Sequence, residues 1–243
     1  MRTATAKVFG FAVMLILSTR AYAQKAIPDP VDDATFEALH NEAISKAFTL
    51  SQSGDAAGAE KIFSGVIAGY KAKAIPGRTY FCADDLADTV AVATKSAKTM
   101  KPGSFAIVVG PNWCSALFGE GFVLIDLGRS DEAGRFLAQA TEMAPTKPHY
   151  INEYAEWFKS QRNWQKSFEL FSNAWGLVAH DAKGPDRKIA ARALRGMGFI
   201  KTELGDFDEA ERLFRQSLEY EPERQPFVEN ELKYIADQRK KAS

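Results

Sequence analysis

Two stretches of this chain have nearly the same sequence. "DLGRSDEAGRFLAQATEMAP" runs from Asp126 to Pro145, and "ELGDFDEAERLFRQSLEYEP" runs from Glu203 to Pro222. Their starts lie 77 residues apart (126 to 203), which leaves room for one more copy at a period of about 34 residues. A diverged copy, "SQRNWQKSFELFSNAWGLVA", stands at 160–179. Such a chain is constrained to fold as a stack of similar units, each covering the open face of its neighbour.

The sizes of the repeated residues predict pairs of antiparallel helices. Helices approach closely only where side chains are small, and a large apolar residue then fills the groove beside the contact. Small residues recur at three equivalent places, and a large residue recurs at a fourth. These sets are Gly121, Ala155 and Gly198; Ala133, Ser167 and Ala210; Ala140, Ala174 and Ser217; and Leu137, Phe171 and Phe214. Gly128 and Gly205 stand where a residue with positive φ can end the first helix of each pair.

The two best copies, at 121–145 and 198–222, share a Gly, a turn Gly, an Ala and a terminal Pro. In this pattern the chain resembles the tetratricopeptide repeat, a helix–turn–helix unit of about 34 residues. The chain departs from the family at Glu120 and Met197, where Leu is usual, and at Arg162, which replaces the turn glycine. The resemblance implies an all-α solenoid whose first helices line a concave surface that holds peptides or protein segments.

The repeats divide the chain into segments. We expect repeats at 114–147, 148–181 and 191–224, with 182–190 as a lengthened turn, and a degenerate repeat at 40–73 after a lead-in at 24–39. Residues 74–113 predict an irregular helical unit, with helical spacing at Phe81, Leu86 and Val90. The apolar run 105–109 in this unit favours a short extended segment over a distorted helix. Residues 225–243 predict a capping helix and a tail.

The N-terminus indicates export. Two positive charges, a short apolar run at 8–17 and the small residues of "AYA" predict a signal peptide at 1–23, cleaved after Ala23. An uncleaved membrane anchor is the alternative, but the run is shorter than the roughly 20 residues of a spanning helix. Gln24 follows the site, so no cysteine is there to carry a lipid. We therefore expect a periplasmic protein without stable membrane insertion, or a secreted one.

The charge balance argues against some partners. The chain has 31 Lys+Arg and 31 Asp+Glu, and the leader removes three of the cations, so the mature chain carries 28 against 31, a net charge of −3. This balance does not predict a nucleic acid as partner. Cys82 and Cys114 can form one disulfide in an exported protein, or remain two buried thiols.

The sequence contains little that predicts catalysis. His40, His149 and His180 stand in different repeats without metal-ligand spacing, so we expect no metal and no cofactor. The alternative function is an enzyme with its site in the irregular unit, around Cys82, Asp84, Asp85 and Trp113.

The resemblance places a different set of residues on the concave face. Position by position, the first helices carry Phe118, Phe122, Asn152, Lys159, Arg192 and Arg195. An apolar end beside a basic end fits an extended peptide that carries a carboxylate. The sequence therefore predicts a non-catalytic protein-binding scaffold of the bacterial envelope, with a protein or peptide as partner.

Overall fold

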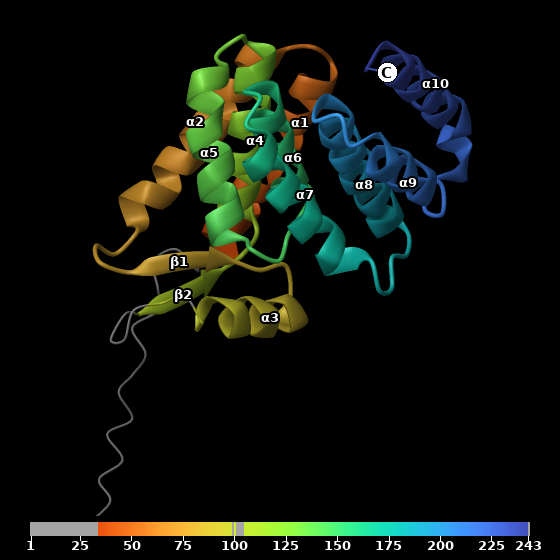
Figure 1. Cartoon of the computed structure of the whole chain (residues 1–243). Coiled ribbons are helices and arrows are strands. Elements are labelled where there is room, and N and C mark those ends of the chain that lie inside the picture. Colours follow the sequence, from red (N-terminus) through yellow and green to blue (C-terminus); the bar gives the residue numbers. More distant parts are fainter. Residues whose placement is uncertain (1–33, 99, 101–104, 243) are drawn as a thin grey trace, which may run out of the picture.

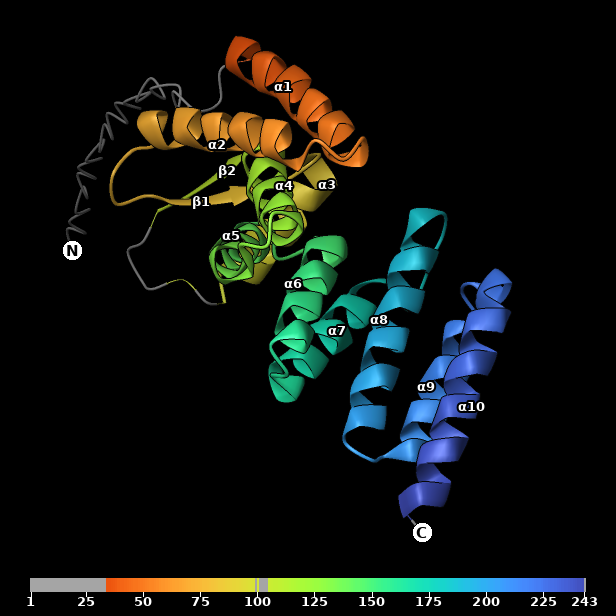
Figure 2. The same cartoon turned by 90° about the horizontal axis from the view of Figure 1, so that it is seen from above.

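The computed structural model describes residues 34–98, 100 and 105–242, so the expected signal peptide and most of the lead-in lie outside the described residues. The helices run in the order α1 (Ala34–Gln52), α2 (Ala56–Lys73), α3 (Leu86–Ser96), α4 (Asn112–Asp126), α5 (Ser130–Met143), α6 (Pro148–Ser160), α7 (Trp164–Val178), α8 (Pro185–Glu203), α9 (Phe207–Ser217) and α10 (Gln225–Ala242) (Figure 1). They stack with α1 and α10 at opposite ends (Figure 2). The prediction of an all-α solenoid is confirmed.

Four helix pairs form the repeats: α1 with α2, α4 with α5, α6 with α7, and α8 with α9. The small residues lie in the contacts within the pairs, since a Cβ added at Gly121 would sit 2.7 Å from Leu137 Cγ. The turn between the helices of each pair contains one residue with positive φ. These residues are Gly54, Gly128, Arg162 and Gly205. Arg162 therefore adopts, at a cost in strain, the conformation that glycine takes in the other repeats.

The first two repeats stack directly on each other. Helix α2 packs against α4, and a Cβ added at Gly119 of α4 would lie 2.3 Å from Cζ of the buried Phe63 of α2. Residues 74–111 are thus an insertion between adjacent repeats, which lies beyond one end of α2, α4 and α5 (Figure 1). The irregular unit that we expected at 74–113 thus lies in the region of this insertion.

The insertion is a strand–helix–strand unit. Strand β1 (Thr79–Cys82) pairs in parallel with β2 (Ala106–Val109), and α3 connects them. The expectation of helix at Phe81 was wrong, because Tyr80, Phe81 and Cys82 are buried on both faces of a strand. A continuous buried run of this kind carries no alternation that would reveal a strand in the sequence. Strand β2 lies within the run that we expected to be extended.

The C-terminal part differs from expectation in one respect. Helix α8 begins at Pro185, six residues before the expected repeat boundary, so most of 182–190 extends the helix instead of lengthening the turn. Proline is favoured in the first turn of a helix, where its missing N–H would have no partner. Val228 and Ile235 of α10 pack on Ala210 and Phe214 of α9, so α10 caps the stack. Among the described residues, no helix combines the length and apolar character needed to cross a membrane.

Candidate functional site

The first helices of the repeats and the cap carry the face on which the ligand is expected. We call the surface formed by α4, α6, α8 and α10 the first-helix face. At its α4 end, Phe118 is half-buried and stacks on Tyr150 with ring centroids 4.7 Å apart. Phe122, one turn further along α4, is 38% exposed. The aromatic end predicted from the sequence thus has one packed and one accessible ring.

The basic end of the first-helix face contains a cavity of about 170 Å³, which we call the α8 pocket. Lys159 of α6 and Arg192 and Arg195 of α8 line it together. Phe199 of α8 and Phe227 of α10 add apolar surface and are 37% and 43% exposed. The pocket therefore offers cations and accessible aromatic rings to the same ligand.

Glutamates compensate two of these cations. The Arg192 guanidinium lies 2.9 Å from Glu153 and 3.7 Å from Glu156. Glu156 also pairs with the Lys159 ammonium at 2.5 Å, and this ammonium lies 5.0 Å from the centroid of the Phe199 ring. The sequence analysis did not predict these ion pairs, although the spacing of three between Glu156 and Lys159 is one at which helix side chains meet. The first-helix face is therefore of mixed charge, not simply basic.

Arg195 is the least satisfied of the three cations. Its side chain is 17% exposed, and Nη1 lies 2.7 Å from Oε2 of the buried Glu221. The two atoms form an ion pair, but they are not aligned for a hydrogen bond. Neither atom has another hydrogen-bond partner. The buried Nη1 therefore faces Glu221, and the rest of the guanidinium is left to contact a ligand in the α8 pocket.

Asn152 does not face a ligand. It is 1% exposed, and its Nδ2 donates a hydrogen bond of 3.0 Å to the carbonyl of Ile189. Asn152 therefore holds α6 against α8, which corrects its expected place on the binding surface. The sequence position predicted the correct helix but not the direction of the side chain.

Glu231 of α10 also lines the α8 pocket. Burial raises the pKa of its carboxyl above the ordinary value, and the nearby Lys159 opposes this only in part. Glu231 therefore adds a second carboxyl to the pocket beside that of Glu156.

The residues of the alternative enzyme site have structural roles. Cys82 and Cys114 form a disulfide with Cα atoms 6.2 Å apart, so Cys82 carries no free thiol. Asp85 caps α3 by accepting a hydrogen bond from the Asp88 amide. Trp113 is 4% exposed and stacks on Tyr70, with centroids 5.3 Å apart. The nucleophile on which the enzyme interpretation depended is thus absent from this arrangement.

The acidic residues of the insertion are bound to a lysine. The Lys147 ammonium lies 2.5 Å from Asp84 and 2.7 Å from Asp88. Burial raises the pKa of Asp88, but hydrogen bonds from Lys147 and Thr146 outweigh it and leave the pKa below its ordinary value. The ion pairs fasten the start of α3 to the connection between α5 and α6. Among the described residues, no group of three or more His, Cys, Asp or Glu could hold a metal ion.

Paired helices, small-residue contacts and a capped end define a helical-repeat solenoid. Models of the tetratricopeptide-repeat family match residues 115–147 and 148–220. The chain is therefore a tetratricopeptide-repeat protein, and such repeats form scaffolds for protein–protein interaction. No curated protein has a significantly similar sequence.

Solved structures share the fold at low sequence identity. The chain is similar to pilF of Pseudomonas aeruginosa, with a TM-score of 0.58 and 12% identity over 85% of this chain and 72% of that one. It is also similar to the MamA protein, with a TM-score of 0.53 and 13% identity over 82% and 81% of the two chains. At such identities the similarity describes the fold alone.

Proposed function

We propose that this protein is a non-catalytic scaffold of the bacterial envelope that binds an extended segment of a partner protein on the first-helix face. The observation that carries the proposal is the gathering of Lys159, Arg192 and Arg195 around the α8 pocket. Arg195 contacts Glu221 through Nη1, and the remaining N–H groups of its guanidinium can bind a ligand carboxylate, an acceptor that guanidinium groups bind strongly.

The rest of the pocket fits a segment with a carboxylate beside an apolar residue. Lys159 and Arg192 surround the place of the carboxylate, while Phe199 and Phe227 offer apolar surface. A peptide that lies along the face towards α4 would then reach the exposed ring of Phe122. The partner segment would thus be acidic at one end and aromatic or aliphatic at the other.

The location in the envelope rests on two features of the chain. The leader at 1–23 has the charges, the apolar run and the small residues of an export signal. The Cys82–Cys114 disulfide is of a kind that forms and persists in oxidising compartments such as the periplasm. Both features support export, with the periplasm as the favoured destination.

The test begins with capture of partners from envelope extract by residues 24–243, followed by titration calorimetry with the partner. The informative variant combines Arg195→Ala with Glu221→Gln, because removal of the arginine alone would leave the buried Glu221 carboxylate uncompensated. We expect this variant to bind the partner more than tenfold more weakly, which corresponds to about 1.4 kcal/mol.

Arg212→Ala is the matched control. Arg212 lies on α9, where it is paired with Glu209 and is 57% exposed, so its loss should leave the affinity unchanged. Thermal unfolding of each variant establishes that the fold is retained. Equal affinities for parent, variant and control would refute binding at the α8 pocket.

A further inference from the structure

One residue of β1, Tyr80, has backbone groups that point away from β2 beside a cleft, whereas Cys82, the other such residue, is fully buried. The amides of Thr79 and Ala83 each donate a 3.0 Å hydrogen bond to β2, to the carbonyls of Phe105 and Val109. Backbone groups alternate in direction along a strand, so the N–H and C=O of Tyr80 point away from β2. In the part of the chain that the structure describes, these two groups form no backbone hydrogen bond.

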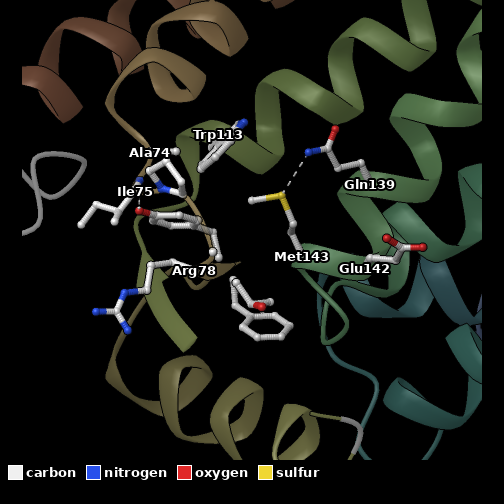
Figure 3. A pocket seen from close by; sticks show the side chains of 12 residues that line it. Ala74, Ile75, Arg78, Trp113, Gln139, Glu142 and Met143 are labelled. Carbon is white, nitrogen blue, oxygen red and sulfur yellow. Dashed lines mark hydrogen bonds between the residues drawn. The ribbon is translucent and has the colours of Figure 1, made fainter. Parts of the chain in front are cut away.

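This cleft of about 450 Å³ lies beside the outer edge of β1, and we call it the edge cleft. Figure 3 shows Ile75 and Arg78 on one side of it and Gln139, Glu142 and Met143 of α5 on the other. Its volume falls in the range of roughly 300–1,000 Å³ that is typical of ligand pockets. The cleft therefore has room for a ligand between the strand and α5.

The inner end of the edge cleft is apolar with one unsatisfied donor. Trp113 and Met143 line it and are 4% and 8% exposed. The indole Nε1 of Trp113 is buried and has no acceptor among the described residues. The wall from β1 is aromatic too, since Tyr80 and Phe81 belong to the lining. An apolar side chain would pack against these residues.

The shape and chemistry of the cleft favour one kind of occupant. A donor and an acceptor side by side on a strand edge match the main chain of an extended peptide, whose side chains then alternate between two directions. The edge is recessed beside α5, so a single strand fits better than the sheet of a second copy. The rim carries both signs of charge, at Glu142 and at Arg78, whose guanidinium lies 4.3 Å from the centroid of the Phe105 ring. The backbone of a peptide carries no net charge, so neither of these two residues repels it.

We propose that the edge cleft is a docking site at which an extended segment of a partner protein pairs with β1 at Tyr80. The segment pairs with the backbone of Tyr80 and places an apolar side chain towards Trp113 and Met143. The site is built by the insertion and α5, and it is independent of the α8 pocket.

The test uses seven-residue random peptides displayed on phage and selected against residues 24–243. Selected peptides are then titrated against a semisynthetic protein in which the α-hydroxy analogue replaces Tyr80. This change removes the outward N–H and keeps the side chain, but it also makes the Thr79 carbonyl, which points to β2, a weaker acceptor. The matched control carries the α-hydroxy analogue at Ala106, whose N–H points outward from the opposite edge of the same sheet. This control weakens the Phe105 carbonyl, the acceptor of the Thr79 amide, in the same way.

We expect the Tyr80 ester to weaken peptide binding about tenfold, at the upper end of what one hydrogen bond contributes. The Ala106 ester and Arg192→Ala should leave it unchanged. Gln139→Trp, which narrows the cleft from α5 without touching β1, should also weaken binding. Failure of any peptide to be selected, or equal affinity for the Tyr80 ester and the parent, would overturn the proposal. Peptides that lose affinity with Arg192→Ala instead would assign the binding to the α8 pocket.

Discussion

Gly119→Ala tests the direct contact between the first two repeats. A Cβ at this position would lie 2.3, 2.5 and 2.7 Å from three atoms of the Phe63 ring. The ring must move by about 1 Å to reach ordinary van der Waals contact. It has little room to do so, because Phe63 is fully buried and Phe48 packs against it with centroids 5.0 Å apart.

Two opposing effects set the magnitude. Overpacking a core costs about 1–3 kcal/mol, and three crowded ring atoms favour the upper end. Alanine offsets about 1 kcal/mol of this loss in stability, because it favours the helix more than glycine does. We therefore expect Gly119→Ala to lower the free energy of unfolding by about 2 kcal/mol. For a chain of this size the loss corresponds to a fall in Tm of about 4–8 °C.

Gly65→Ala provides the matched control. Gly65 lies on α2, close to Phe63 in sequence, and an added Cβ there meets no atom within 4 Å. Without crowding, this substitution should raise stability by about 0.5–1 kcal/mol through helix propensity alone. Urea unfolding followed by tryptophan fluorescence compares both variants with the parent. A Gly119→Ala protein as stable as the Gly65→Ala protein would refute the close approach of α2 and α4.

Three further predictions concern the thiols, a buried carboxyl and the N-terminus. Intact mass with and without reductant, after alkylation, should show Cys82 and Cys114 bonded, and replacement of both by Ala should cost about 3–4 kcal/mol because the bridge closes a loop across a separation of 32 residues. Burial raises the pKa of Glu120, so its ionised form destabilises the fold, and Glu120→Gln should raise Tm at pH 7. That gain should vanish as the pH falls below the ordinary carboxyl pKa of about 4–5, where the folded and unfolded parents are both protonated. Mass spectrometry of the exported protein should find Gln24 at the N-terminus, and a retained 1–23 segment would contradict cleavage.

The repeats could be predicted from residue spacing. The 34-residue period, the small residues at fixed places and the turn glycines all follow from local spacing, and these predict which helices pair. The same argument placed the fully buried Ala133, Ser167 and Ala210 in the helix contacts. The argument succeeded because each repeat contacts mainly its neighbours, so residues that touch in the structure are also near each other in the sequence.

Other features could not be predicted, because they depend on contacts between distant parts of the chain. The placement of 74–111 as a strand–helix–strand insertion depends on α2 meeting α4 across nearly forty residues of chain. Ion pairs such as Arg195 with Glu221 join different helices and change the charge of the α8 pocket. The direction of Asn152 depends on the carbonyl of Ile189, which only the packed neighbouring helix supplies. The periodicity of a sequence predicts which face of a helix is buried. These features instead depend on contacts between residues of different elements, whose positions in the sequence follow no regular spacing.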